Sequence, residues 1–463
     1  MTVAGAGPLR RAARAWHDFW LAPGRGLSLD VARIVVGLAL LGVYGALGAD
    51  LFALYADGGW IDRAAALELR PVGWSVLFWL PPGWPQQAAL LLFVAALVAF
   101  TLGLGTRWVK WLVWAGHLSL LHRNPALAYG LDNIAASVLF LLALAPIGAQ
   151  LSLDRVRAVR RARLRALDEL PPVPASARAT LVLRLLQIQM ALFFFVAGSA
   201  KLQGDSWWYG FALWYAVNNH EYMNLPVAWW AEQFWLVNVL SYGTVLLELA
   251  YPFLVWNRAR AAMLAGALAL HLGIAVVLGL YAFSAVMIAA HLAFVRESWW
   301  AAAGAWWRRR CGGMEMIYDG HCAFCKRSMA AFLAFDGLRQ IAVRDFRAQP
   351  SPVVPDAALE KALYLVTRDG RALPGFDAYR HAVLRVPGLW WMLPLFFVPF
   401  VSRAVGTRVY DWVARHRHVI STCGSGDAPA CAIEPGAPPR AASGTPAASA
   451  PAPSRTAPAS SAR

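Results

Sequence analysis

The sequence predicts a polytopic α-helical membrane domain of about eight helices, followed by a smaller α/β domain. Hydrophobic residues make up 59% of the chain and charged residues only 15%, which is too apolar for an ordinary soluble protein. Several stretches approach the roughly 20 apolar residues that span a bilayer. After Met314 the pattern changes to short apolar runs separated by turn residues. The 463 residues are enough for both domains.

Each membrane helix is expected from its own apolar stretch. The stretch 261–295 is too long for a single crossing, so we divide it at Gly279. The expected helices fall within residues 34–47, 87–105, 108–121, 134–149, 180–200, 227–256, and the two halves of 261–295.

The first 20 residues carry arginines ahead of an apolar helix, as a signal peptide does. These arginines lie too far from the apolar stretch, and no small-residue cleavage site follows. We therefore expect a helix on the membrane surface.

The chain has a formal net charge of +16, and the positions of its cations predict its orientation in the membrane. The cations cluster beside the expected membrane helices and not on one soluble face, so we expect no nucleic-acid partner. If the N-terminus is cytoplasmic, every strongly basic loop is cytoplasmic too. We predict a multi-pass protein of the cytoplasmic (inner) membrane, with the lipid bilayer as a partner and with a cytoplasmic N-terminus and C-terminal domain. The basic positions are Arg107, Lys110, residues 154–170, Arg258, Arg260 and residues 308–310.

Three segments follow from these patterns: a membrane domain over 1–307, an α/β domain over 314–420 and a disordered tail over 421–463, rich in Ala, Pro and Ser. Within the α/β domain we expect strand, loop and helix, then strand, Asp-Gly turn, strand and helix. The apolar run 389–401 is short and contains proline, so we place it in the soluble core or at the membrane surface. An inserted hairpin is the alternative.

The stretch "IYDGHCAFCKRS" contains two cysteines three positions apart. In a C-x-x-C that opens a helix, the first sulfur lies at the helix N-terminus, where free amides and the helix dipole stabilise a thiolate. Cys322 is thus the expected nucleophile and Cys325 the resolving thiol, with Lys326 and Arg327 adding positive charge. Half of a zinc site is the alternative. The chain has no second C-x-x-C and no H-x-x-x-H, so we predict no metal.

The motifs "YDGHCAFC", "DGRALPGFDAYRHAV" and "VYDWVARHRHVI" resemble the DCC family of thiol-disulfide oxidoreductases. The resemblance implies a thioredoxin-like fold, with Asp319, Cys322 and Cys325 matching the family's D-x-x-C-x-x-C. The Asp319 side chain has two alternative roles: it caps the loop, or it accepts a proton from the buried thiol. No proline precedes the strand expected to face the dithiol, where thioredoxins have a cis-proline. Cys423 and Cys431 are either an electron relay or tolerated tail thiols.

Lys201 ends an apolar helix and is followed by aromatic residues, in "LFFFVAGSAKLQGDSWWYGFAL". Such a lysine either anchors the helix at the interface or, if shielded from water, acts as a base. The motif "AGSAKL" followed by Trp207 and Gly210, with "LHRNPALAYGLDN" and "LLELAYPFL", resembles the HTTM family, which includes the vitamin K-dependent gamma-carboxylases. The resemblance implies that Lys201 is a catalytic base. We expect its neighbours Trp207, Trp208 and Tyr209 to form an aromatic lid over a flat, lipid-soluble ring.

Pro125 stands where carboxylases carry a histidine, so we do not expect gamma-glutamyl carboxylation. The candidate ligand of the membrane domain is a membrane quinone or another lipid-soluble molecule. We predict no other cofactor. Intramembrane polar residues are expensive, and Glu248, His271 and His291 are candidates for a ligand pocket or proton path, with structural pairing as the alternative. We place Glu248 at a depth similar to that of Arg184 and Gln187.

We expect a membrane redox protein whose cytosolic dithiol exchanges with an unknown partner. In a reducing cytosol an exposed C-x-x-C rests as the dithiol and donates electrons. The alternatives are a carboxylase-like membrane enzyme that acts on a quinone, and a redox-sensing transporter or scaffold.

Overall fold

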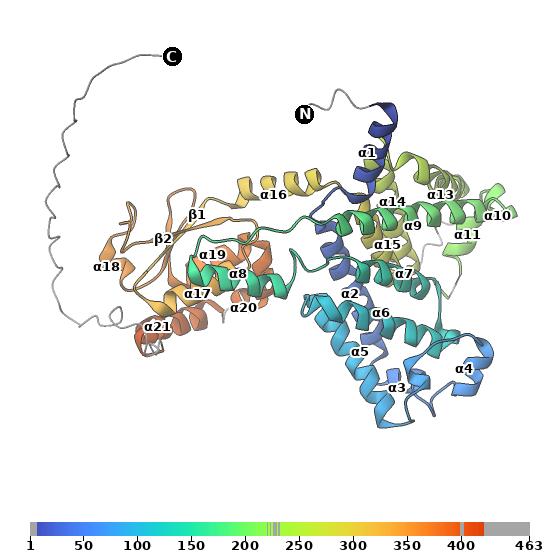
Figure 1. Cartoon of the computed structure of the whole chain (residues 1–463), viewed down its shortest axis with the longest axis horizontal. Coiled ribbons are helices and arrows are strands. Elements are labelled where there is room, and N and C mark those ends of the chain that lie inside the picture. Colours follow the sequence, from blue (N-terminus) through green and yellow to red (C-terminus); the bar gives the residue numbers. More distant parts are fainter. Residues whose placement is uncertain are drawn as a thin grey trace, which may run out of the picture.

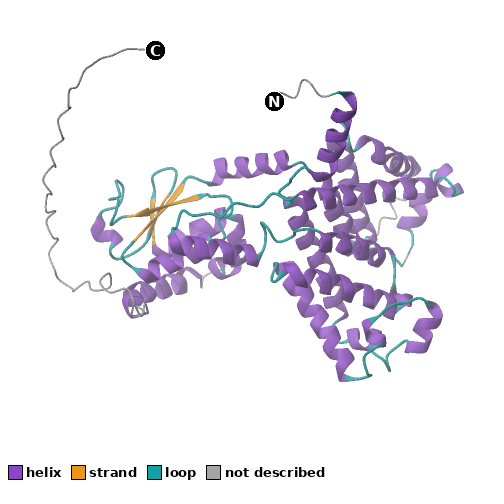
Figure 2. Cartoon of the chain, viewed as in Figure 1, coloured by secondary structure: helices purple, strands orange, loops and turns teal. Residues whose placement is uncertain are grey.

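The structure is a computed structural model that describes residues 7–219, 221–222, 224–225, 229, 232–398 and 402–420. A large helical part lies at one end, and a smaller part that contains the only sheet of the described residues lies at the other (Figures 1 and 2). The predicted tail, with Cys423 and Cys431, lies outside the described residues.

The helical part agrees with the predicted membrane domain. Its elements are α1 (Pro8–Leu21), α2 (Leu27–Leu47), α3 (Asp50–Tyr55), α4 (Arg63–Leu69), η2 (Val76–Phe78), α5 (Trp84–Leu102), α6 (Thr106–Arg123), η3 (Pro125–Leu127), α7 (Gly130–Leu144), α8 (Leu153–Arg165), α9 (Ala177–Lys201), α10 (Asp205–Trp208), α11 (Ala212–Val217), α13 (Phe234–Leu254), α14 (Arg260–Leu278), α15 (Tyr281–His291), η4 (Leu292–Phe294) and α16 (Glu297–Cys311).

Five described helices are long and apolar enough to cross a membrane: α2, α5, α9, α13 and α14. The other three expected helices correspond to α6, α7 and α15, which are shorter or less apolar. Gly279 adopts a φ of 72° directly after α14, a conformation that ends helices and favours glycine. This turn confirms the division of the stretch 261–295.

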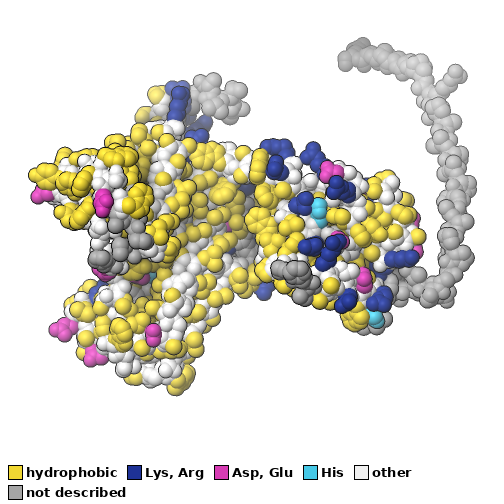
Figure 3. Space-filling model, turned by 180° about the vertical axis from the view of Figure 1, so that it is seen from behind, with side chains coloured by type: hydrophobic (Ala, Val, Ile, Leu, Met, Phe, Trp, Pro, Cys, Tyr) yellow, Lys and Arg dark blue, Asp and Glu magenta, His cyan; other side chains and the backbone are white. Residues whose placement is uncertain are grey.

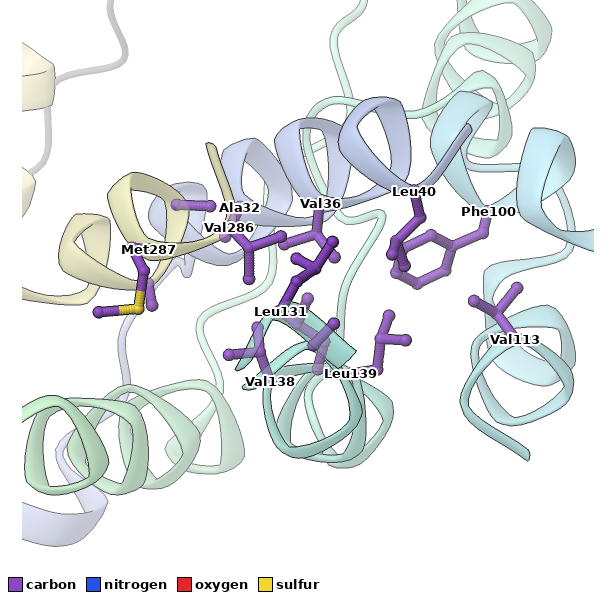
Figure 4. Packing of buried hydrophobic residues seen from close by; sticks show 14 of the residues in the cluster. Ala32, Val36, Leu40, Phe100, Val113, Leu131, Val138, Leu139, Val286 and Met287 are labelled. Atoms are coloured by element: carbon purple, nitrogen blue, oxygen red, sulfur yellow. The ribbon is translucent and has the colours of Figure 1, made fainter. Parts of the chain in front are cut away.

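The core of the helical part lies where α2 crosses α5, α7 and α15 (Figure 4). Val36 and Leu40 of α2 are buried against side chains of the neighbouring helices, among them Leu139 of α7 and Val286 of α15. Such close packing, rather than the hydrophobic effect alone, holds helices together in a membrane.

Two buried charges, Asp30 and Arg33, tie the start of α2 to the loop after α7. The Asp30 carboxylate accepts hydrogen bonds from the backbone N–H groups of Gly148, Gln150 (2.8 Å) and Leu151 (3.1 Å). Arg33 donates to backbone carbonyls, including that of Thr101 at 2.7 Å. Because buried charges need partners, these bonds fix one end of the bundle.

The second part has the predicted α/β architecture. Its sheet has the order β2-β1-β3-β4, with β1 parallel to β2 and the other neighbours antiparallel. Met316 of β1 lies between Val343 and Leu365 and is fully buried. The elements are β1 (Met314–Tyr318), α17 (Ala323–Leu333), β2 (Ile341–Asp345), α18 (Asp356–Leu359), β3 (Tyr364–Val366), β4 (Ala372–Pro374), α19 (Gly375–Arg385), η5 (Pro387–Met392), α20 (Leu393–Phe397) and α21 (Ser402–Ile420).

The apolar run 389–401 divides its side chains between the domain core and the surface. Leu389 and Phe396 are buried in the same cluster as Met316, whereas Trp391 and Leu395 are exposed. Residues 399–401 lie outside the described part of the chain.

Two helices connect the parts. The helix α16 continues past residue 307, where the sequence placed the end of the membrane domain, and its Trp307 donates a hydrogen bond to the carbonyl of Arg385 at 2.9 Å. The helix α8, which lies between α7 and α9 in the chain, packs on α17, and Leu167 just after it joins the core of the α/β part. Seen from behind, Lys and Arg gather over the α/β part, while hydrophobic side chains cover most of the helical part (Figure 3).

Candidate active site

The dithiol lies in the turn between β1 and α17. Gly320 in this turn packs so closely against β2 that a Cβ atom would lie 1.7 Å from Oδ2 of Asp345. The Gly320 N–H donates to Asp345 Oδ1 at 3.0 Å, and the His321 N–H donates to Asp319 Oδ1 at 3.0 Å. The geometry around Asp319 is that of a loop cap.

Cys322 is the N-cap residue of α17. Its sulfur accepts a hydrogen bond from the backbone N–H of Cys325 at 3.2 Å, as the oxygen of a serine cap does. The pKa of Cys322 is lowered to about 7, chiefly by the hydrogen bond from the Cys325 thiol, while burial acts in the opposite direction. The same hydrogen bond, with burial, raises the pKa of Cys325. Near neutral pH, therefore, Cys322 is the cysteine of the pair that ionises, and Cys325 keeps its proton.

The cation that favours this thiolate comes from an element that the sequence analysis did not connect with the site. Arg417 of α21 lowers the pKa of Cys322, whereas Lys326 and Arg327 have exposed side chains on α17. The helix α21 also closes a cavity of about 50 Å³ beside Cys325, together with Tyr318, Phe324 and residues of α18 and α19. A signal for Arg417 was present in "VYDWVARHRHVI", but only the fold shows what that helix covers.

Lys201 forms an ion pair with Glu248. Its Nζ lies 2.9 Å from Oε1 and 2.8 Å from Oε2 of the carboxylate, which α13 places beside the end of α9. The Trp207 ring centroid is 5.2 Å from Nζ, whereas Trp208 is 60% exposed and donates to the carbonyl of Leu202. The structure thus brings together three of the predicted site residues and leaves Trp208 at the surface.

Arg184 and Gln187 do not share the depth of Glu248. They bond to each other at 2.8 Å on α9, and Arg184 is 17 residues before Lys201, or about 26 Å along the helix axis. The sequence pattern could not show this difference, because it depends on how α9 and α13 pack against each other.

His271 and His291 form a second buried pair. Their ring centroids are 5.4 Å apart, and the Tyr251 hydroxyl lies 2.6 Å from Nδ1 of His291. Tyr251 is one turn after Glu248 on α13, so the same helix carries both polar groups. Within the described part of the chain, neither ring nitrogen of His271 has a hydrogen-bond partner.

Comparison with protein families assigns both parts. Residues 140–299 match the HTTM domain, and residues 316–423 match the DCC1-like thiol-disulfide oxidoreductases. The chain joins an HTTM domain to a DCC1-like domain. No curated protein and no solved structure matches it. Both families are those that the sequence motifs predict.

The two candidate sites lie in different domains, the dithiol in the DCC1-like domain and Lys201 in the HTTM domain. Helix α9 ends at Lys201, 24 residues and about 36 Å along its axis from its first residue, and α10, which follows, lies at the end of the molecule away from the DCC1-like domain (Figure 1). Direct electron or proton transfer between Cys322 and Lys201 is therefore not expected. Across the described ranges, no group of three or more His, Cys, Asp or Glu residues is placed to hold a metal ion.

The lowered pKa of Cys322 predicts a specific pH profile. Alkylation by iodoacetamide should rise about tenfold per pH unit below 7 and level off above it, because only the thiolate reacts. In Cys325→Ala, which has no side-chain group to donate to Cys322, the midpoint should move upward, towards that of a free thiol at about 8.5. Mass spectrometry of the Cys322 peptide measures both curves, and a midpoint that does not move in the variant would contradict the role given to Cys325.

Proposed function

We propose that the DCC1-like domain reduces disulfides of a partner protein, with Cys322 as the nucleophile and Cys325 as the resolving thiol. The observation that supports this proposal is that the two cysteines differ in their pKa values. Cys322 accepts two hydrogen bonds at the start of α17 and ionises near neutral pH, while Cys325, which is less buried, keeps its proton. An attacking thiol with a pKa near the ambient pH combines a high thiolate fraction with good nucleophilicity.

The exchange proceeds in two displacements. The Cys322 thiolate attacks one sulfur of the partner disulfide, and the other sulfur leaves as a thiolate and takes a proton from water. Cys325 then gives up its proton and attacks the sulfur of Cys322, which releases the second partner thiol. The partner gains two electrons and two protons, and the domain is left with a Cys322–Cys325 disulfide, which a dithiol reductant must reduce.

The nucleophile is not freely accessible. Only 5% of the Cys322 surface is exposed, while His321 beside it is exposed. We expect a partner disulfide to approach over the exposed turn at His321. This arrangement favours a protein partner that binds the turn over small disulfides that meet the sulfur by collision.

Oxidation of the full chain tests the proposed exchange. Reduced protein incubated with an equimolar disulfide substrate should yield a peptide pair that joins Cys322 to Cys325 and is lighter by two hydrogens than the reduced pair. A disulfide between Cys322 and Cys423 or Cys431 instead would assign the resolving role to the tail.

We also propose that the DCC1-like domain faces the cytosol of the cell, with Lys201 near the opposite surface. The cations on α8 and at the end of α16 support this orientation, since Lys and Arg concentrate in cytoplasmic loops. A membrane-impermeant maleimide should label the native cysteines only after the cells are opened. Tyr209→Cys, at a side chain that is 69% exposed at the other end, should be labelled in intact cells. The reverse labelling pattern would show that the protein has the opposite orientation in the membrane.

A second candidate function is binding of a membrane quinone by the HTTM domain. It is supported by the unpartnered ring nitrogens of His271, which is 3% exposed, and by the Lys201–Glu248 pair near Trp207. The donors among these groups, an N–H of His271 and the Lys201 ammonium, suit the carbonyl oxygens of a flat, lipid-soluble ring. Organic extraction of purified protein should release a quinone, and His271→Leu should lose it. Ligand flux that persists without the dithiol would instead support a transporter or scaffold whose thiols only sense the redox state.

A further inference from the structure

A cavity of about 390 Å³ opens between α6, α7 and α9, at the end of the HTTM domain that carries α8. It lies at the opposite end of α9 from Lys201 and belongs to neither site described above. The cavity is lined by Arg107, Trp108, Lys110, Trp111, Ala143, Leu144, Arg178, Leu181, Val182 and Leu185.

The charged residues of this lining are all cations. Arg107 and Lys110 come from the first turn and a half of α6, and Arg178 comes from the first turn of α9. In the ranges that the structure describes, neither Arg107 nor Arg178 forms a hydrogen bond or ion pair through its guanidinium, and no carboxylate lines the cavity. Among the described residues, these three cations therefore have no ion-pair partner.

Lys110 gives the strongest indication that the cavity binds a ligand. Its side chain is buried, with 7% of the residue exposed, and its Nζ donates to the carbonyl of Ala145 at the end of α7, at 2.6 Å. Nothing else among the described residues pairs with this ammonium group, which has three protons to donate. A buried cation without a counter-charge is unfavourable, and an anion in the cavity supplies one.

The remaining lining is apolar and reaches the outer surface of the bundle. Trp108 is 71% exposed and Trp111 38%, and the apolar side chains of α7 and α9 form the opposite wall. A site with cations at one end and exposed tryptophans beside it fits a ligand with an anionic head and an apolar tail.

We propose that this cavity binds the phosphate headgroup of an anionic phospholipid. Arg107, Lys110 and Arg178 hold the phosphate by charge-assisted hydrogen bonds, and the acyl chains run along Trp108 and Trp111. This site goes beyond the proposed redox function, because it is independent of the dithiol and of Lys201.

Native mass spectrometry of the full chain tests the site, in mild detergent with equal amounts of phosphatidylglycerol and phosphatidylcholine. The protein should retain phosphatidylglycerol selectively. Arg107→Gln/Arg178→Gln should weaken that retention about 30-fold, from the loss of two headgroup cations. The matched control, Arg160→Gln/Arg161→Gln, removes two exposed charges from the neighbouring α8 and should leave retention unchanged.

Three results would overturn the proposal: equal loss in both double variants, equal retention of the two lipids, or displacement of the lipid by millimolar inorganic phosphate, which would make the ligand a soluble anion. Leu185→Phe keeps all three cations and fills the cavity, so it should also lose the lipid. This variant tests the site independently of the folding of the arginine variant.

Discussion

Replacing Cys322 with serine is expected to abolish disulfide reduction by the full chain, with a loss of roughly 10³-fold or more. A serine hydroxyl caps α17 as well as the thiol does, so the fold should persist, but the hydroxyl does not ionise near neutral pH and forms no disulfide. The assay is the rate of reduction of a fluorescent disulfide substrate by protein in detergent.

Cys311→Ser is the matched control for this loss. Cys311 ends α16, outside the dithiol turn, and the variant should keep full activity. Comparable activity in Cys322→Ser and Cys311→Ser would contradict the assignment of Cys322 as the nucleophile.

Replacing Lys201 with methionine is expected to destabilise the HTTM domain by on the order of 3 kcal/mol. The change leaves the Glu248 carboxylate, only 9% exposed, without its ion-pair partner. Lys201→Met/Glu248→Gln should recover much of the stability, because no unpaired charge remains buried. Thermal unfolding of the purified variants measures both changes, and additive losses in the double variant would show that the pair is not coupled.

Lys201→Arg separates the ion pair from a chemical role. Arginine can keep the pair with Glu248, so the variant should be as stable as the unmodified protein, but a guanidinium cannot release its proton as a base does. A variant that is stable and inactive in a quinone-dependent assay supports a catalytic Lys201. Normal activity would leave Lys201 as a structural anchor.

Local sequence signals predicted most of the fold. Each membrane helix has its own apolar stretch, Gly279 marks a break that its positive φ explains, and the pair Asp369 and Gly370 forms the turn between β3 and β4. These features depend on residues close together in the chain, where periodicity and turn chemistry act directly.

The partners within each site could not be predicted, because they come from distant segments. Asp345 reaches Gly320 only through the parallel pairing of β1 and β2, and Arg417 reaches the dithiol only because α21 folds back over α17. The strand β2 itself was missed, since it is short and carries charged residues. The Lys201–Glu248 pair likewise depends on how α9 and α13 cross, which neither helix encodes alone.

The most direct test of the central claim is to trap the partner with Cys325→Ser. Without its resolving thiol, Cys322 should remain joined to the partner in a mixed disulfide. Membranes from cells expressing the full-length variant should yield a reductant-sensitive adduct whose linked peptide contains Cys322. The adduct should be absent from Cys322→Ser/Cys325→Ser. An adduct that persists in the double variant, or no adduct in Cys325→Ser, would contradict the assignment of Cys322 as the nucleophile of thiol-disulfide exchange.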